Sequence, residues 1–165
     1  MEPARGPRTL RGSTGHGSVE GMRLTLTPSS DPADYPFTHP IRTRFAETDA
    51  MGVIHHGAYV TYLEEARAAL LRHRGHPYDD VRGDGIDLAV LELYVRYRRA
   101  LHFDEVVDVH VSLGRVTRTT FQVGYLLTVA GEIRASAVTV HGAVDTEGRG
   151  RRLPTWLTEL VDPAT

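Results

Sequence analysis

Residues 58–74 read AYVTYLEEARAALLRHR and contain the clearest helical pattern in the sequence. Apolar side chains recur there at intervals of three and four residues, from Tyr59 to Leu70, with charged side chains between them. Gly75 and Pro77 follow directly, and both residue types end helices. The stretch therefore predicts one long amphipathic helix with a single apolar face to bury.

The segments on either side of this helix have the pattern of strands. Before it, Ile41, Thr43 and Phe45 alternate with arginines, as in a half-buried strand. After Gly85, apolar and β-branched residues fill four segments joined by short connections, at residues 86–97, 105–116, 119–129 and 132–145. Short connections predict that these four strands form an antiparallel meander. The order strand, long helix, strands predicts an α+β fold in which the helix covers one face of a sheet.

The two ends of the chain read differently from the middle. Residues 1–36 are rich in Gly, Pro, Ser and Thr, which predicts a disordered N-terminal extension before a domain over residues 37–165. Residues 153–157 read LPTWL and predict a closing helical turn with Trp156 buried. A length of 165 residues, 41% of them apolar, fits a single domain.

Charge and hydropathy exclude several partners. The net charge of -2 and the pI near 6.5 provide no field that would attract nucleic acid. No apolar run approaches the length of a bilayer span, and the N-terminus lacks the apolar segment of a secretory signal. We therefore expect no nucleic-acid partner, no membrane insertion and a cytoplasmic location.

Missing residue types remove several catalytic strategies. All 19 basic residues are arginine, so a lysine Schiff base and a Walker-type phosphate lysine are excluded. Cys is absent, which excludes thiol nucleophiles and disulfides. Beyond residue 36 the only serines are Ser112 and Ser136, and neither lies in a G-x-S-x-G elbow. Carboxylates, histidines, Thr and Tyr hydroxyls and backbone amides remain for chemistry.

The densest group of reactive side chains lies in residues 47–59, ETDAMGVIHHGAY, directly before the helix. Free amides at a helix N-terminus favour negative charge, so the N–H groups of His56 and Gly57 are candidate donors to an oxyanion. Asp49 could fold back to attack a thioester carbonyl or to deprotonate a water that does so. An Asx turn beside Gly52 explains Asp49 equally well, and the spacing alone does not decide between the two.

Other polar residues near this loop have simpler interpretations. Glu47 could pair with Asp49, but a solvent-facing side chain is the simpler expectation. The adjacent His55 and His56 should point to opposite faces of an extended chain, one lining the site and one exposed. We therefore expect no metal site. Tyr59 and Tyr62 are expected to be core residues with a polar tip. The pair Glu64 and Arg67, at i and i+3, is expected on the surface.

Residues 45–67, FAETDAMGVIHHGAYVTYLEEAR, resemble the signature of the hotdog-fold 4-hydroxybenzoyl-CoA thioesterase family. The similarity is specifically to the acyl-CoA thioesterase branch associated with the Tol-Pal gene cluster, and it covers roughly residues 38–160. It implies a hotdog fold, a long central helix wrapped by an antiparallel sheet, and no cofactor. It also implies that Asp49 is the catalytic carboxylate and that the His56 N–H polarises the thioester carbonyl. Tyr59 and Glu64 match further motif positions and are expected to have supporting roles.

The same resemblance implies how the subunits associate and how the substrate binds. Dimers that pair sheets edge to edge, tetramers built from two dimers, and sites at the dimer interface are expected. The CoA nucleotide is expected to bind arginines of the hairpin between the two middle long strands and arginines near the C-terminal end, here Arg115, Arg118, Arg151 and Arg152. For any one of these arginines, a solvated loop position is the alternative.

Three functions are compatible with the sequence. The first is hydrolysis of an acyl-CoA thioester to the free acid and CoA. The second is hydrolysis of an acyl or polyketide chain held on a carrier protein. The third is a non-catalytic acyl-CoA-binding protein on the same fold, although a binding protein has no need for an acid at position 49.

Overall fold

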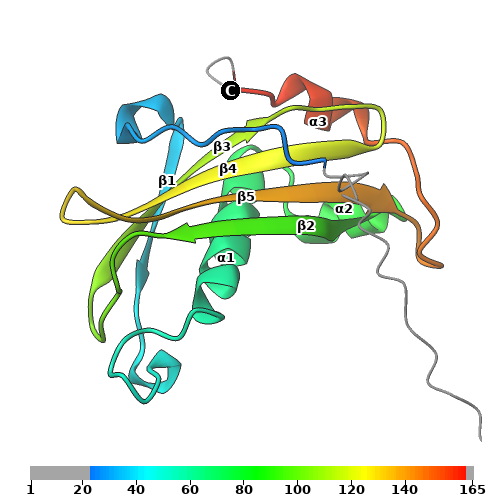
Figure 1. The fold of residues 1–165 in the computed structure, drawn as a ribbon. Coiled ribbons are helices and arrows are strands. Elements are labelled where there is room, and N and C mark those ends of the chain that lie inside the picture. Colours follow the sequence, from blue (N-terminus) through cyan, green and yellow to red (C-terminus); the bar gives the residue numbers. More distant parts are fainter. Residues whose placement is uncertain (1–22, 163–165) are drawn as a thin grey trace, which may run out of the picture.

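One five-stranded antiparallel sheet and one long helix make up most of the computed structural model, which describes residues 23–162 (Figure 1). The predicted α+β architecture is confirmed. The strands are β1 (Phe37–Arg42), β2 (Asp87–Tyr97), β3 (Val106–Gly114), β4 (Thr120–Val129) and β5 (Glu132–Val144). The helices are α1 (Ala58–His73), α2 (Tyr78–Gly83) and α3 (Thr155–Glu159), with short 3-10 turns η1 (Pro32–Asp34) and η2 (Phe45–Glu47).

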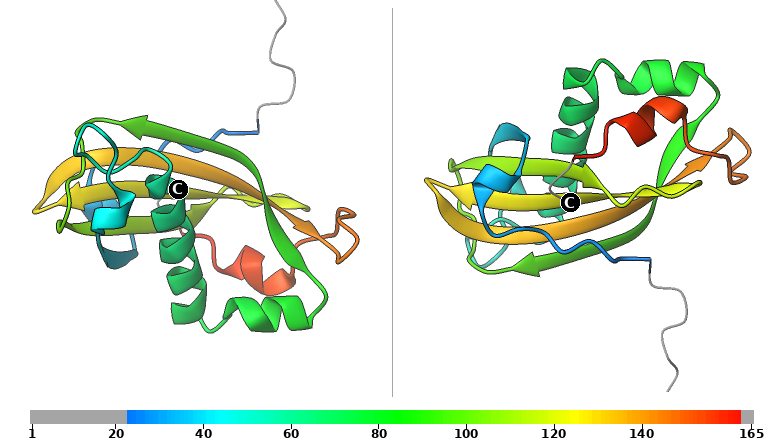
Figure 2. Two further views of the ribbon diagram at one scale, coloured as in Figure 1. Left: turned by 90° about the horizontal axis from the view of Figure 1, so that it is seen from below. Right: turned by 90° about the horizontal axis from the view of Figure 1, so that it is seen from above.

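Helix α1 lies where the sequence pattern predicts it and packs on one face of the sheet. Its buried side includes Tyr62, Leu63 and Ala66, which join the side chains of β3 in one apolar core. Gly75 has a φ of +83°, the left-handed conformation that commonly ends a helix. Figure 2 shows all three helices on the same side of the sheet. No helix within residues 23–162 is long and apolar enough to cross a bilayer.

The strand order is β1-β3-β4-β5-β2, so the predicted four-stranded meander is wrong for β2. Only β3, β4 and β5 follow one another as hairpin-connected neighbours. The edge of β3 that β2 would need is taken by β1, with Ile41 opposite Val107. Strand β2 therefore pairs with β5 at the far side of the sheet, with Leu93 opposite Thr139.

Three local expectations can be compared with the structure. The tight hairpin at Ala130 and Gly131 is confirmed, because both residues have positive φ, as a type I′ turn requires. The first strand ends at Arg42, and Phe45 is 72% exposed in η2 rather than half-buried in a strand. In the closing helix α3, Leu157 is the fully buried residue, while Trp156 is only partly buried against the core.

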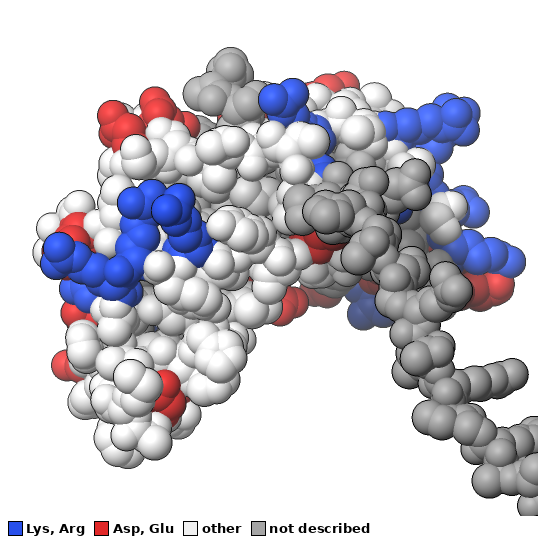
Figure 3. Space-filling view, viewed as in Figure 1, with Lys and Arg blue, Asp and Glu red and all other residues white. Residues whose placement is uncertain are grey.

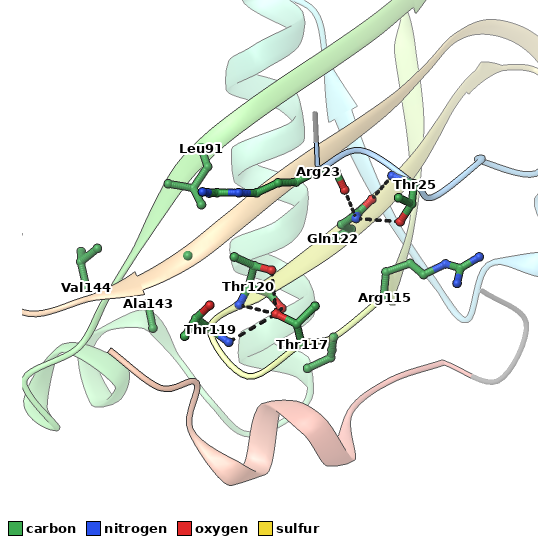
Figure 4. A pocket seen from close by; sticks show the side chains of 12 residues that line it. Arg23, Thr25, Leu91, Arg115, Thr117, Thr119, Thr120, Gln122, Ala143 and Val144 are labelled. Atoms are coloured by element: carbon green, nitrogen blue, oxygen red, sulfur yellow. Dashed lines mark hydrogen bonds between the residues drawn. The ribbon is translucent and has the colours of Figure 1, made fainter. Parts of the chain in front are cut away.

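Residues 23–28, here named the N-terminal strap, lie across the face of the sheet opposite α1 (Figure 2). The Gln122 side chain of β4 holds it: Oε1 accepts the amides of Thr25 and Leu26, and Nε2 donates to the Arg23 carbonyl (Figure 4). The missing side chain of Gly124 lets Leu26 approach, because a Cβ there would lie 3.1 Å from Leu26 Cδ2.

The strap differs from the expectation of a disordered segment over residues 1–36. The Gln122 side chain bonds the strap backbone, and the Glu92 carboxylate accepts the amides of Arg23 and Leu24, so the strap is fixed on the sheet. Residues 1–22 lie outside the described residues. The ordered part of the domain therefore begins before β1.

We expect Gln122→Leu to loosen the strap. The substitution keeps the side-chain volume but leaves the strap amides and the Arg23 carbonyl without their partner, which should cost about 1–3 kcal/mol of unfolding free energy. Urea unfolding measures the loss. Thr119→Val is the matched control, because Thr119 lines the same cavity and its hydroxyl makes no hydrogen bond among residues 23–162. Equal stability of the two variants would contradict the anchoring role of Gln122.

Candidate active site

Glu47 fixes the start of the loop that leads into α1. Its carboxylate accepts the Arg44 amide at 2.8 Å, the Arg44 guanidinium at 2.5 Å and the Tyr62 hydroxyl at 2.5 Å. The side chain is only 11% exposed, so the expectation of a solvent-facing Glu47 is wrong. Burial by itself would raise the pKa of Glu47, but the hydrogen bonds from Arg44 and Tyr62 outweigh it and lower the pKa below its usual value. Glu47 is thus an ionised anchor and not half of a reactive carboxylate pair.

Backbone hydrogen bonds close the loop on itself. The His55 amide donates to the Glu47 carbonyl at 2.7 Å, and Thr48 and Ile54 form an isolated β-bridge. The Ile54 amide donates to the Leu101 carbonyl at 2.8 Å, which ties the loop to the segment after β2. As a consequence, residues at both ends of the loop, separated in sequence, lie side by side at the N-terminus of α1.

Asp49 both holds the loop turn and lines a cavity. Its Oδ1 accepts the Met51 amide at 2.8 Å, and its carbonyl accepts the Gly52 amide at 3.0 Å, so the Asx-turn interpretation is confirmed. Gly52 has a φ of +74°, which the turn requires. Asp49 also lines a cavity of about 270 Å³ together with His56 and Tyr59, two other predicted site residues. The structural role therefore accompanies a position at the cavity and does not replace it.

The two predicted amide donors differ in their surroundings. The Gly57 N–H donates to Nδ1 of His55 at 3.0 Å, so it is already engaged. The His56 N–H has no hydrogen-bond partner within the described part of the chain. Its peptide is oriented all the same, because the His55 carbonyl accepts the Ala58 amide at 2.9 Å. The His56 N–H is thus a fixed donor at a helix N-terminus.

Tyr97, at the end of β2, contributes to this cavity and was not predicted. Its hydroxyl donates to the His56 carbonyl at 3.1 Å, and its ring packs edge-on against Tyr59 at 4.9 Å between centroids. Arg98 and Arg99 follow it and line the cavity as well. No short motif marks these residues, because they reach the loop only through the pairing of β2 at the sheet edge. Burial raises the pKa of Tyr59, which keeps this buried hydroxyl neutral.

The loop histidines do not point to opposite faces as expected. The rings of His55 and His56 lie 4.0 Å apart, because the chain turns into the helix here instead of staying extended. His56 lines the cavity, while His55 binds the Gly57 amide, and both are exposed. Within residues 23–162, no three His, Cys, Asp or Glu side chains are placed to hold a metal ion.

Glu64 and Arg67 lie further along α1 and outside this cavity. Both line a second, smaller cavity between α1 and the sheet. Glu64 is exposed, but Arg67 is buried and no ion pair joins them, so the expected surface pair is wrong. The helix turns Arg67 towards the sheet, while the carboxylate of Glu64 stays at the surface.

The four arginines assigned to CoA binding gather at one end of the sheet. Arg115 and Arg118 lie in the hairpin between β3 and β4, and the Arg118 carbonyl accepts the Leu153 amide at 3.0 Å. The Arg151 amide donates to the Ala143 carbonyl, which brings the segment before α3 to the same place. All four arginines, including Arg152, are exposed. Figure 3 shows basic side chains projecting at this end, where β5 ends and α3 begins.

Arg115 also borders the cavity of about 680 Å³ between the strap and this hairpin (Figure 4). Arg151 lies 3.9 Å from the Asp145 carboxylate, and Asp145 is mainly paired with Arg149. The arrangement therefore leaves the guanidinium groups of this end largely accessible to solvent.

We expect Tyr62→Phe to destabilise the loop anchor. Removing a hydroxyl that donates to an ionised carboxylate should cost about 1–3 kcal/mol of unfolding free energy at neutral pH. Because the folded state lowers the pKa of Glu47, its stabilisation is present above the ordinary Glu pKa and is lost as pH falls through the lowered value. The variant should therefore lose less stability than the wild type between about pH 5 and pH 3.

Thermal unfolding across that pH range tests the expectation, with Tyr78→Phe as the control. The Tyr78 hydroxyl has no hydrogen-bond partner among residues 23–162. If Tyr62→Phe kept the acid sensitivity of the wild type, as the control should, the hydrogen bond to Glu47 would make no measurable contribution to the free energy of unfolding.

Known proteins share this architecture. Residues 51–136, more than half of the chain, match the family model described as the Thioesterase superfamily. A protein of Aquifex aeolicus is 39% identical over 106 residues, which cover 64% of this chain and 83% of that protein. A 1,4-dihydroxy-2-naphthoyl-CoA hydrolase of Synechococcus elongatus is 28% identical over 138 residues, 79% of this chain and 99% of the relative.

Solved structures agree with the sequence comparison. The DHNA-CoA thioesterase from Staphylococcus aureus superposes with a TM-score of 0.70 at 29% identity, over 74% of this chain and 83% of that one. A hypothetical protein from Aquifex aeolicus superposes with a TM-score of 0.73 at 36% identity, over 76% of this chain and 99% of that one. The predicted hotdog fold is confirmed, and the chain belongs to the Thioesterase superfamily.

Proposed function

We propose that this protein is an acyl-CoA thioesterase that hydrolyses its substrate to the free acid and CoA, with Asp49 as general base or nucleophile. The observation that carries the proposal is that Asp49 and His56 border one cavity at the N-terminus of α1, where the oriented His56 N–H has no partner among residues 23–162. The signature over residues 45–67 supports a place in the acyl-CoA thioesterase branch associated with the Tol-Pal gene cluster.

The proposed reaction uses the two groups on opposite sides of the thioester carbonyl. The carbonyl oxygen accepts the His56 N–H, which stabilises the negative charge that develops as the carbonyl carbon is attacked. Asp49 either takes a proton from the attacking water or adds to the carbon itself to give an anhydride that water then hydrolyses. The C–S bond breaks, and the CoA sulfur leaves as a thiolate that takes up a proton.

The supporting groups orient these two. Tyr97 binds the His56 carbonyl and Tyr59 packs against Tyr97, so the rings fix the peptide at the start of α1. The Met51 amide holds one oxygen of Asp49, which leaves the other oxygen for chemistry. Because the Gly57 amide binds His55, we assign the oxyanion contact to His56 first, with Gly57 available after a rotation of the His55 ring.

The CoA nucleotide is proposed to bind the exposed arginines Arg115, Arg118, Arg151 and Arg152. They converge at one end of the sheet because the Leu153 amide binds the hairpin between β3 and β4. Planar guanidinium groups suit phosphate oxygens, which they can bind through two parallel hydrogen bonds.

A second copy of the chain is proposed to complete the site. Strand β2 lies at the edge of the sheet and carries exposed Val90, Leu91, Leu93, Tyr94 and Tyr97. A long apolar edge of this kind is unstable in water unless another strand covers it. Pairing two β2 strands around a two-fold axis would form one continuous sheet and bring the partner's surface to the cavity beside Tyr97. The family resemblance extends this to a tetramer of two such dimers.

Asp49→Asn should reduce turnover of acyl-CoA substrates by at least about a hundredfold, the usual scale for a lost catalytic acid or base. The amide keeps an oxygen for the Met51 N–H, so the fold should be retained. Release of free CoA thiol from a panel of aliphatic and aromatic acyl-CoA substrates measures the effect. Asp79→Asn, an exposed change on α2, is the control and should behave as the wild type. Near-normal turnover by Asp49→Asn would refute the assigned role.

Tyr94→Glu should separate the proposed dimer. The two-fold axis places like charges on facing edges, which repel each other and prevent pairing. Light scattering after size exclusion should show a monomer, and thiol release should fall with it. Val161→Glu, at an exposed apolar position outside β2, should leave both unchanged. A fully active monomeric Tyr94→Glu variant would show that one chain holds the complete site.

A further inference from the structure

Two separate cavities lie between α1 and β2. The Asp49 cavity is bordered by Tyr59 of α1 and Tyr97 of β2. The second cavity, of about 50 Å³, is bordered by the apolar residues Val60 and Leu63 of α1 and Val90 and Leu93 of β2. Its lining also includes the polar side chains of Glu64, Arg67, Thr139 and His141. Both cavities thus lie between the same two elements.

Arg67 is a buried cation in the lining of the second cavity. Arg67 is only 6% exposed, and its Nη1 atom has no hydrogen-bond partner within the described residues. No carboxylate of residues 23–162 forms an ion pair with Arg67. This includes Glu64, which lines the same cavity. A buried guanidinium without a counter-charge is costly, because burial removes its hydration.

A neutral donor lies beside Arg67. His141 is 1% exposed and stacks on Phe121, and its Nε2 bonds the Thr139 hydroxyl at 2.7 Å. Its other ring nitrogen, Nδ1, has no partner among the described residues. Burial, and secondly the charge of Arg67, lower the pKa of His141 to about 3, so the ring is neutral at physiological pH. When Nε2 accepts the Thr139 proton, Nδ1 carries a hydrogen that can be donated.

We infer that Arg67 and His141 recognise a carboxylate at the far end of the acyl group, so the substrate is the CoA thioester of a dicarboxylic acid. This inference rests on the proposed thioesterase function and specifies its substrate class. An anionic terminus supplies the charge that Arg67 lacks and an acceptor for His141, while methylenes of the chain contact Val60, Leu63, Val90 and Leu93.

The geometry of α1 sets the scale of the acyl chain. Tyr59 and Arg67 are eight residues apart, about 12 Å along the helix. Long helical side chains lean towards the helix N-terminus, which brings the guanidinium closer to the Asp49 cavity. A spacing of this order along the helix suits a straight acyl chain of medium length better than a short acyl group.

The test compares suberyl-CoA with octanoyl-CoA, two thioesters of equal chain length that differ only in a terminal carboxylate or methyl group. The wild type is expected to favour suberyl-CoA in kcat/KM by about tenfold to a hundredfold, the ratio that one charge-assisted contact provides. Arg67→Met keeps the length of the side chain without its charge, and should remove or reverse this preference while octanoyl-CoA is still hydrolysed. Arg72→Met, at an exposed arginine of the same helix, should retain it.

Thermal unfolding of the same variants gives a second readout. Because Arg67 has no counter-charge in the described chain, Arg67→Met should not lower the melting temperature of the unliganded protein. A wild type that hydrolyses octanoyl-CoA as well as suberyl-CoA overturns the inference and leaves the thioesterase proposal intact. The inference also falls if Arg67→Met lowers the melting temperature and keeps the wild-type preference, because Arg67 then serves a contact between subunits. Hydrolysis of no acyl-CoA refutes the proposed function itself.

Discussion

Burial of the apolar face of α1 is the constraint on which the rest of this structure depends. A helix with one apolar face needs one apolar surface, and the inner side of the curved sheet provides it. Once α1 lies there, its N-terminus is fixed beside the end of β2 and the loop before it must fold against both. The candidate site at Asp49 is therefore a consequence of core packing, since the same contacts that stabilise the fold hold the His56 peptide in place.

Polar groups at the surface of this core separate structural residues from candidate functional ones. The Glu47 carboxylate accepts hydrogen bonds from Arg44 and Tyr62 within the chain, and its role is to hold the loop. Arg67 and His141 are buried, and the Nη1 atom of Arg67 and the Nδ1 atom of His141 have no hydrogen-bond partner among the described residues. Folded proteins rarely leave buried donors unpaired, so such groups point to a missing partner. The contrast between satisfied and unsatisfied polar groups is the reason for proposing that the second cavity binds part of the substrate.

The position of β2 at the edge of the sheet connects the fold with the proposed assembly. Pairing with β5 places the apolar side chains of β2 beside α1, where they border both cavities, and leaves the other edge of the strand open. The strap covers the opposite face of the sheet through Gln122. The surface proposed for a second copy therefore adjoins the candidate site, so the proposed assembly and the proposed substrate binding would use neighbouring parts of one element.

The sequence alone determined α1, most strand positions, the hairpin at Ala130 and the loop carrying Asp49, because helical periodicity, strand alternation and turn residues are local properties. The partner of β2 was decided only in the tertiary structure: β1 occupies the edge of β3, and no local pattern records that competition. The same holds for Glu47, Tyr97 and Arg67. Packing brings Glu47 and Tyr97 within hydrogen-bond reach of residues distant in sequence. It buries Arg67 at a place where no described residue bonds its Nη1 atom.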